Sequence, residues 1–184
     1  MFGYAGKILH VDLTNGTIEI EEPAEELYRT YLGGSALGMY YLLKNTPAGA
    51  DPLGPDNTMA FMLSGVTGAP VAGQSRCTVV AKSPLTGAVG DSQAGGFWPA
   101  ELKFAGFDGI VVRGRSESPV WLSILEGQPP ALHDAAGLWG LDTYETQQRA
   151  RGDLGVKRLG GSHRHFNVPA GAGVNHAVGL EGQV

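Results

Sequence analysis

The stretch from Gln74 to Gly114 gathers residue types that can hold an anion: Arg76, followed by glycines and other small residues. The β-branched run from Cys77 to Ala81 predicts a strand directly after the arginine. Glycines at 87, 90, 95 and 96 then predict a Gly-rich loop, in which few side chains separate backbone N–H groups from a ligand. The pattern therefore favours a site for an anionic group.

The elements expected around this loop place it beside a helix. Pro99 suits the first turn of a helix that we expect to run through Phe104, and residues 107–112 are typical of a buried strand. Gly95 and Gly96 then stand just before the helix N-terminus, where free N–H groups and the helix dipole favour phosphate. Two plainer interpretations stay open: a simple turn for the glycines and a surface ion pair for the arginine.

The whole sequence predicts an α+β fold with mainly antiparallel β-sheets and short helices. Residues 7–13 and 17–21 are typical of a hairpin with a two-residue turn at Asn15-Gly16, and residues 24–44 have a helical pattern that Gly33-Gly34 divides. Further elements are expected as strands at 59–63, 120–125 and 131–133, and as a helix at 143–149 with Thr143 as N-cap. The repeated order of hairpin and helix indicates duplicated β-hairpin-plus-helix repeats.

Composition excludes several classes of function. The 184 residues suffice for one ordinary domain, and a net charge of −5 argues against a nucleic-acid surface or a polybasic membrane surface. The single cysteine, Cys77, excludes an intramolecular disulfide, cannot alone hold an iron–sulfur cluster, and is expected in the core. No apolar run has the length of a membrane-spanning helix and the first residues lack a signal-peptide core, so a cytoplasmic location is expected.

Other side chains have both a functional and a structural interpretation. His163 and His165, with His176, have the residue type for a metal site, although a third ligand is distant in sequence. Lys82 and Lys103 either line the anion site or form a solvated rim. The tyrosines are expected in the core or at a domain interface rather than stacked on a cofactor, namely Tyr28, Tyr31, Tyr40 and Tyr41.

Longer motifs give the chain a resemblance to a known family. The segments concerned are Gly6-Lys7-Ile8-Leu9, Val11-Asp12-Leu13, Leu32-Gly33-Gly34, Arg76, the KSPLTG run from Lys82 to Gly87, Gly95-Gly96, the ELKFAGFDGIVV run from Glu101 to Val112, and Leu138-Trp139-Gly140. With these the chain resembles the N-terminal domain of the aldehyde ferredoxin oxidoreductase family, which are tungsten or molybdenum bis-pyranopterin enzymes. The resemblance covers residues 1–155, which we expect to form the pterin-binding base domain, and leaves 156–184 as a divergent, loosely ordered tail.

The resemblance implies a cofactor site on this domain. In the family, the domain is a β-rich base of two intertwined repeats on which the pterin lies, and an arginine that corresponds to Arg76 contacts the pterin phosphates. The main chain of the segment that corresponds to Gln93, Ala94, Gly95 and Gly96 contributes further cofactor contacts. Where this chain has Gln93 the family often has asparagine, whose backbone carbonyl helps to hold a magnesium ion between the phosphates. A guanidinium suits this task because it forks onto phosphate oxygens.

The resemblance also implies what this chain lacks. The complete enzymes oxidise aldehydes to carboxylic acids and pass electrons through a [4Fe–4S] cluster to ferredoxin, but the cluster cysteines and the acid/base residues belong to later domains. A second cofactor segment of the type ARGGLGAVMGSK should follow the last helix, where only Gly171-Ala172-Gly173 stands. We therefore expect a fragment without catalytic residues of its own that acts with missing C-terminal domains or a separate subunit. The alternative is a non-catalytic remnant or an anion- or pterin-binding module.

Overall fold

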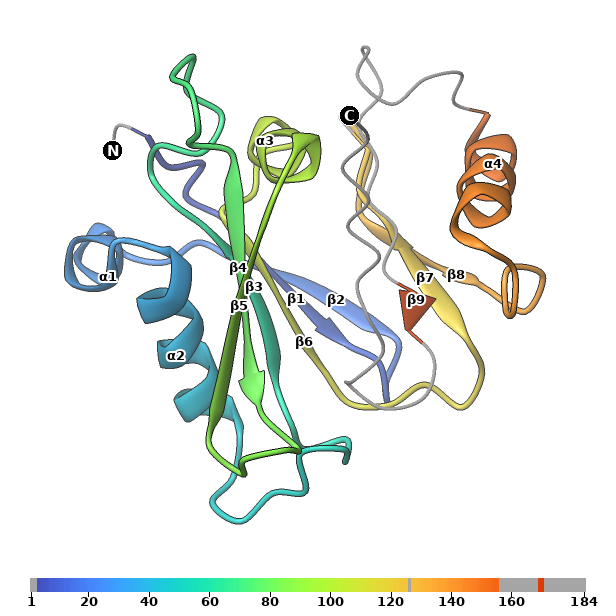
Figure 1. The fold of residues 1–184 in the computed structure, drawn as a ribbon, viewed down its shortest axis with the longest axis horizontal. Coiled ribbons are helices and arrows are strands. Elements are labelled where there is room, and N and C mark those ends of the chain that lie inside the picture. The colour runs from blue at the N-terminus through green and yellow to red at the C-terminus, as the bar shows by residue number, and fades with distance from the viewer. Residues whose placement is uncertain (1–2, 126, 156–168, 171–184) are drawn as a thin grey trace.

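The computed structural model describes residues 3–125, 127–155 and 169–170, and its elements form successive layers (Figure 1). The strands are β1 (Ile8–Asp12), β2 (Thr17–Glu21), β3 (Met59–Leu63), β4 (Arg76–Lys82), β5 (Val89–Gly95), β6 (Gly109–Arg113), β7 (Val120–Ser123), β8 (Ala131–Asp134) and β9 (Pro169–Ala170). The helices are α1 (Glu25–Tyr31), α2 (Gly34–Asn45), α3 (Phe97–Phe104) and α4 (Thr143–Leu154).

A six-stranded sheet with the order β2-β1-β6-β3-β4-β5 is the centre of the fold, and a smaller sheet has the order β8-β7-β9. All strand pairs are antiparallel except β1 with β6. The α+β class with mainly antiparallel pairing is thus confirmed. The order of hairpin then helix also occurs twice, as β1-β2-α1 and as β7-β8-α4.

One core lies between the large sheet and the pair α1 and α2. It contains Ile8, Met62, Tyr28, Leu37 and Tyr41, each of which is fully buried. The strand residues alternate with those of the opposite face, as the two-residue period of a pleated strand requires. Since Tyr31 and Tyr40 pack partly buried against the same cluster, the tyrosines belong to the core as predicted.

A second core fills the opposite face of the large sheet. Leu9, Phe61 and Ile110 pack there against Leu102 of α3 and against Leu122 of the small sheet. Cys77 belongs to this cluster with 1% of its surface exposed, so its predicted place in the core is confirmed. Burial raises the pKa of the Cys77 thiol to about 11. A third, smaller cluster joins α4 to the outer face of the small sheet.

The expected Gly-rich loop after the KSPLTG run is the main correction. Residues 89–95 form β5, which pairs with β4 along its whole length, from Lys82↔Val89 to Arg76↔Gly95. Small residues have a low strand propensity, but the hairpin turn brings this segment beside a finished strand, and pairing with that neighbour outweighs local preference. Helix α3 accordingly begins at Phe97, two residues before the expected Pro99, and β6 begins at Gly109.

The predicted turn of the first hairpin and the predicted N-cap of α4 are also wrong. The first hairpin has a four-residue loop, because Asp12 pairs with Thr17 and its carboxylate accepts from the N–H groups of Thr14 and Asn15. At the start of α4, Asp142 rather than Thr143 is the N-cap, since its carboxylate accepts from the N–H of Glu145 at 2.8 Å. A carboxylate one residue earlier is a better acceptor for the first-turn amides.

Lys103 is not the solvated rim residue that one interpretation expected. Its side chain is only 11% exposed, and its ammonium group pairs with Asp108, whose side chain is 1% exposed. Asp108 also accepts from the N–H groups of Ala5 and Gly6, at 3.0 and 2.6 Å. Lys103 additionally donates to the carbonyl of Gly3 at 3.1 Å. This buried pair therefore fastens the N-terminal segment to the sheet.

Some predictions lie on residues that the structure does not describe. His163, His165 and His176 are among them, as is most of the expected tail, within which Pro169–Ala170 pairs with β7. Across the described ranges, no three His, Cys, Asp or Glu side chains gather in a way that could hold a metal ion. No described helix is long and apolar enough to cross a membrane.

Candidate functional site: one end of the β4–β5 hairpin

The sheet register brings the predicted site residues to one end of the hairpin. Arg76 is the first residue of β4 and stands opposite Gly95, while Thr78 stands opposite Gln93. Because directly opposed residues point to the same face of a sheet, Arg76, Thr78 and Gln93 share the face that α2 covers. The Arg76 side chain is exposed and makes no hydrogen bond or ion pair with any described residue. It is a cation without a counter-charge from the described chain.

The hydrogen-bonding pattern leaves backbone groups of β5 open beside this arginine. At the turn of the hairpin, the N–H of Ser83 donates to the carbonyl of Ala88 at 2.7 Å, so these two residues form a hydrogen-bonded pair. Hydrogen-bonded and non-hydrogen-bonded pairs alternate along an antiparallel ladder. Counted from Ser83 and Ala88, the pairs that contain Gln93 and Gly95 are non-hydrogen-bonded pairs. The N–H and carbonyl groups of both residues therefore point away from β4. No described strand lies beyond β5 to receive them.

The two remaining predicted residues are placed differently. Ala94 packs against the core that contains Cys77, and its backbone belongs to the hydrogen-bonded pair with that cysteine. Gly96 is the N-cap of α3 at φ +103°, a conformation that other residues adopt only under strain. At Gly95, by contrast, an added Cβ would meet only the Ser75 carbonyl at an ordinary 3.5 Å. Packing within the described chain does not explain this glycine, whose backbone no side chain of its own covers.

The loop of residues 64–75 holds the start of β4 in place. The Thr67 hydroxyl donates to the carbonyl of Arg76 at 3.2 Å, and the Gln74 side chain accepts from the N–H of Gly68 at 2.9 Å. The Ser75 hydroxyl donates to the carbonyl of Gly96 at 2.6 Å and so fastens the loop to the end of β5. These bonds fix the backbone of Arg76 while its guanidinium stays free.

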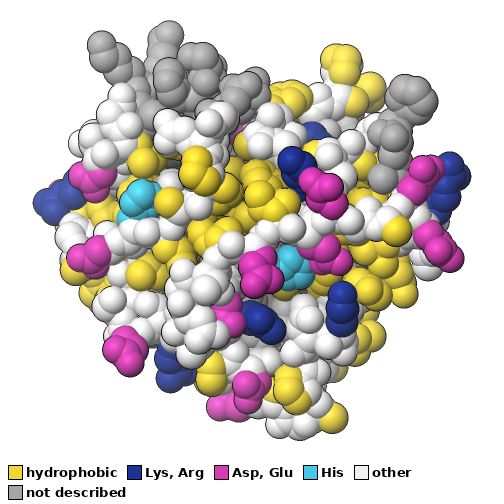
Figure 2. Space-filling model, turned by 180° about the vertical axis from the view of Figure 1, so that it is seen from behind, with side chains coloured by type: hydrophobic (Ala, Val, Ile, Leu, Met, Phe, Trp, Pro, Cys, Tyr) yellow, Lys and Arg dark blue, Asp and Glu magenta, His cyan; other side chains and the backbone are white. Residues whose placement is uncertain are grey.

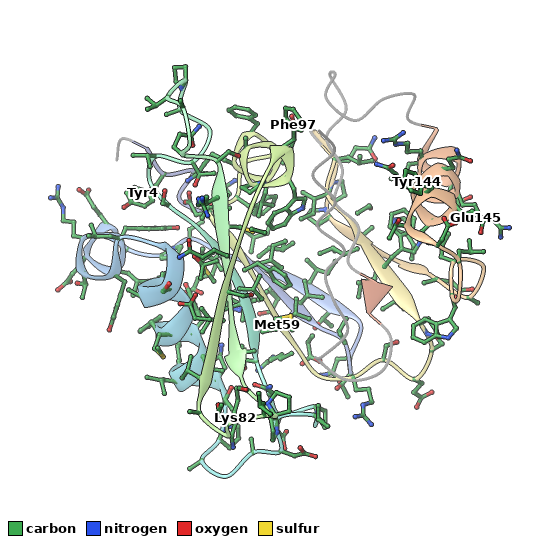
Figure 3. All side chains as sticks on the ribbon, viewed as in Figure 1. Tyr4, Met59, Lys82, Phe97, Tyr144 and Glu145 are labelled. Carbon is green, nitrogen blue, oxygen red and sulfur yellow. The ribbon has the colours of Figure 1, made fainter. Side chains whose placement is uncertain are left out.

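Exposed apolar side chains surround the same end of the hairpin. Phe97, which directly follows Gly96, is 76% exposed and lies far from Lys82 at the other end of the strands (Figure 3). Val66 and Val71 in the loop 64–75 are 60% and 65% exposed, and Leu32, next to the bridge between Gly33 and Ser64, is 66% exposed. We call these four residues the apolar rim. A rim of this kind around a polar site is typical of a surface that another part of a protein covers.

The face of the described chain that Figure 2 shows carries charged side chains of both signs. On the face shown in Figure 2, the described basic side chains are scattered among acidic ones around an apolar centre, and they form no continuous basic field. The full sequence has a net charge of −5, and the expectation that nucleic acid is not the partner stays a prediction of the sequence.

Together the fold and the site define a class: an α+β domain with an exposed arginine and outward backbone groups at one end of a β-hairpin. The family model described as "Aldehyde ferredoxin oxidoreductase, N-terminal domain" matches residues 8–165, and the chain belongs to this family.

Among curated relatives, the tungsten-containing aldehyde ferredoxin oxidoreductase of Pyrococcus abyssi is 40% identical over 159 residues, which are 86% of this chain and 26% of the relative. The aliphatic sulfonate oxidoreductase, WOR-like subunit, of Pyrococcus furiosus is 34% identical over 148 residues, 79% of this chain and 23% of the relative. A solved structure, the active site complex BamBC of benzoyl coenzyme A reductase with 1,5-dienoyl-CoA, matches with a TM-score of 0.81 and 34% identity, over 85% of this chain and 24% of that chain. The chain thus spans about a quarter of the length of these relatives.

Proposed function

We propose that this chain is the cofactor-holding base of a tungsten-dependent enzyme that oxidises aldehydes to carboxylic acids. The observation that carries the proposal is the exposed guanidinium of Arg76, without a counter-charge from the described chain, beside the outward backbone groups of Gln93 and Gly95. Guanidinium and backbone amides are the groups that bind phosphate best. The curated relatives that bear the name aldehyde ferredoxin oxidoreductase are tungsten-containing enzymes, which favours tungsten over molybdenum.

The residues at this end fit a metal bis-pyranopterin through its phosphate groups. Arg76 would fork onto phosphate oxygens, and the outward carbonyl of Gln93 would be a ligand for a magnesium ion held with these phosphates. A backbone carbonyl is independent of the side chain, so glutamine serves here as well as asparagine. When bound, the metal and its pterins supply two-electron redox chemistry. The share of this chain is to bind, position and neutralise charge, and no proton-transfer residue is assigned to it.

The catalytic partner regions would lie outside the described residues. We infer that further domains of the same polypeptide, or a separate subunit, cover the apolar rim and supply the [4Fe–4S] cluster that passes electrons to ferredoxin. The relatives' fourfold greater length supports this inference, as does the exposure of Phe97. A cytoplasmic location stays a prediction of the sequence.

Metal and pterin analysis of the purified chain tests the proposal. The chain is expressed in a host that makes tungsten and molybdenum pterin cofactors, and metal and oxidised pterin are quantified per chain. We expect a measurable content in the wild type, loss in Arg76→Ala, and retention in the control Arg29→Ala, which changes an exposed arginine whose partner is Glu25. Phosphate or pterin binding without metal would instead indicate a non-catalytic binding module. Absence of metal, pterin and phosphate binding from a folded chain would overturn the proposal.

A further inference from the structure

Helix α2 points its N-terminus toward the end of the sheet that carries Arg76. An added Cβ on Gly34 would lie 3.5 Å from the Thr78 hydroxyl, and one on Gly38 would lie 2.6 Å from Val80. Contacts thus advance in the same direction along α2 and β4, so the helix and the strand run parallel (Figure 1). The unpaired N–H groups of the first turn of α2 therefore face the Arg76 end, on the face that Arg76 and Gln93 share.

This helix end has no internal partner for its positive pole. The N-cap is Gly33, no side chain caps the first turn, and the first turn contains no acidic residue. Helix α4 shows the contrast, since Asp142 caps it and Glu145 lies in its first turn. Free N–H groups and the dipole make such an end attractive to an anion, although this alone would not define a site.

The second observation is the hydroxyl of Thr78. The residue is 5% exposed, its hydroxyl faces Gly34 in the first turn of α2, and it makes no hydrogen bond with any described residue. The Thr78 oxygen is not among the fully buried polar atoms of the described chain that lack a partner, so a small part of it stays accessible and a ligand can reach it. Thr78 directly follows Cys77, and its neighbour across the strand pair is Gln93. The unpartnered hydroxyl thus joins the helix end to the candidate site.

We propose that the first turn of α2 and the hydroxyl of Thr78 form a phosphate-binding subsite beside Arg76. The N–H groups of Ser35 and Ala36 and the Thr78 hydroxyl donate to oxygens of a phosphate or pyrophosphate group. The inference rests on the proposed function in that both use Arg76 and the same ligand chemistry. It adds positioning contacts from a segment, Leu32 to Ala36, that is far from Arg76 in sequence.

Threonine-to-valine variants test the hydroxyl. Thr78→Val keeps the shape of the side chain and removes its donor, so we expect pyrophosphate affinity, measured by calorimetry on the 184-residue chain, to fall about 10-fold. Stability without ligand should change little, because no hydrogen bond within the described chain is lost. Thr58→Val is the matched control: Thr58 is fully buried, its hydroxyl also lacks a partner among described groups, and it lies at the Met59 end of β3, away from Arg76.

A new carboxylate tests the helix end. Ser35→Asp places a negative charge in the first turn of α2, which should stabilise the helix and lower pyrophosphate affinity about 10-fold or more by repulsion and competition. The control Ala24→Asp places the same charge at the N-cap of α1, which also has no side-chain cap, and should leave affinity unchanged. Stabilisation together with lost binding is a result that a merely structural role would not produce.

The outcomes of these experiments test the subsite separately from the proposed function. Loss of pyrophosphate binding in Thr78→Val and Ser35→Asp, with both controls unchanged, supports the subsite. Binding that depends on Arg76 but is unaffected by those two variants overturns the subsite and leaves the proposed function standing. Failure of the wild type to bind inorganic pyrophosphate also overturns it, while pterin content of the purified chain decides the proposed function. Parallel assays with inorganic phosphate and with bound pterin distinguish a free phosphate ligand from a pterin phosphate.

Discussion

Replacing Asp108 with asparagine should destabilise the protein more than a change at any exposed charge. The Asp108 carboxylate accepts from Lys103 and from the N–H groups of Ala5 and Gly6, and its side chain is 1% exposed. An amide in its place keeps only one acceptor oxygen and turns a donor toward one of these groups. It also leaves the ammonium of Lys103, which is 11% exposed, without its counter-charge.

The structure allows an estimate of the size. Removing one partner of a buried ion pair costs about 3–5 kcal/mol, because the other charge stays buried and uncompensated. Lys103 retains the carbonyl of Gly3 as an acceptor at 3.1 Å, which reduces the loss. We therefore expect Asp108→Asn to lower the free energy of unfolding by about 3 kcal/mol. The exposed pair of Glu25 and Arg29 serves as a control, and Arg29→Ala should change stability by less than about 0.5 kcal/mol.

Urea unfolding of Asp108→Asn, Lys103→Met and the double variant measures this prediction. Groups in direct contact should be non-additive, with a coupling energy of about 1–3 kcal/mol, since the second substitution removes a charge that the first had left unpaired. A loss below about 1 kcal/mol for Asp108→Asn, or strict additivity of the two changes, would refute the reasoning. The ion pair would then not be what fastens the N-terminal segment.

Three further perturbations have definite outcomes. Gly33→Ala should lower the free energy of unfolding by more than about 2 kcal/mol in denaturant titrations, because φ is +108° and the new Cβ would lie 2.3 Å from the Leu63 carbonyl oxygen. The control Gly16→Ala should lower the free energy of unfolding by less, because no atom lies within 4 Å of the new Cβ. The Cys77 thiol, with its pKa raised to about 11, should not react with a thiol reagent at pH 8 until the protein unfolds, and fast labelling of the native chain would contradict its burial. Partial burial raises the pKa of Asp12, but hydrogen bonds from Asn15 and Thr14 and the charge of Arg113 outweigh it, so the pKa is lowered overall. The ionised carboxylate therefore stabilises the fold above its ordinary pKa of 3.8, and this contribution is lost as pH falls through the lower folded value. In unfolding experiments across pH, Asp12→Asn should cost about 1 kcal/mol at pH 7 and nothing below the folded pKa.

The sequence predicts well those elements whose own residues determine them. The strands at 17–21 and 59–63 have the predicted bounds, because apolar or β-branched runs between turn residues leave little choice of conformation. The segment 89–95 has no such internal preference, and only its pairing with β4 makes it a strand. Lysine is usually a surface residue, and Lys103 is buried only because the fold brings Asp108 and the carbonyl of Gly3 to its ammonium group.

The candidate site also has features that the sequence predicts and features that depend on the fold. Arg76 and the segment from Gln93 to Gly96 stand out in the sequence by residue type and motif, whereas their arrangement depends on the register of the hairpin. Thr78 has no signal of its own within a β-branched run. Its importance depends on α2 lying over β4, although the paired glycines Gly33-Gly34 mark the place where the helix begins.

Calorimetric titration of the chain with inorganic pyrophosphate, for the wild type, Arg76→Ala and the control Arg29→Ala, tests the central claim most directly. If the Arg76 end of the hairpin binds phosphate, Arg76→Ala should weaken binding by about 1.5–3 kcal/mol while the fold and the control variant stay unchanged. Equal binding by the wild type and Arg76→Ala would remove this arginine from the site and contradict the account.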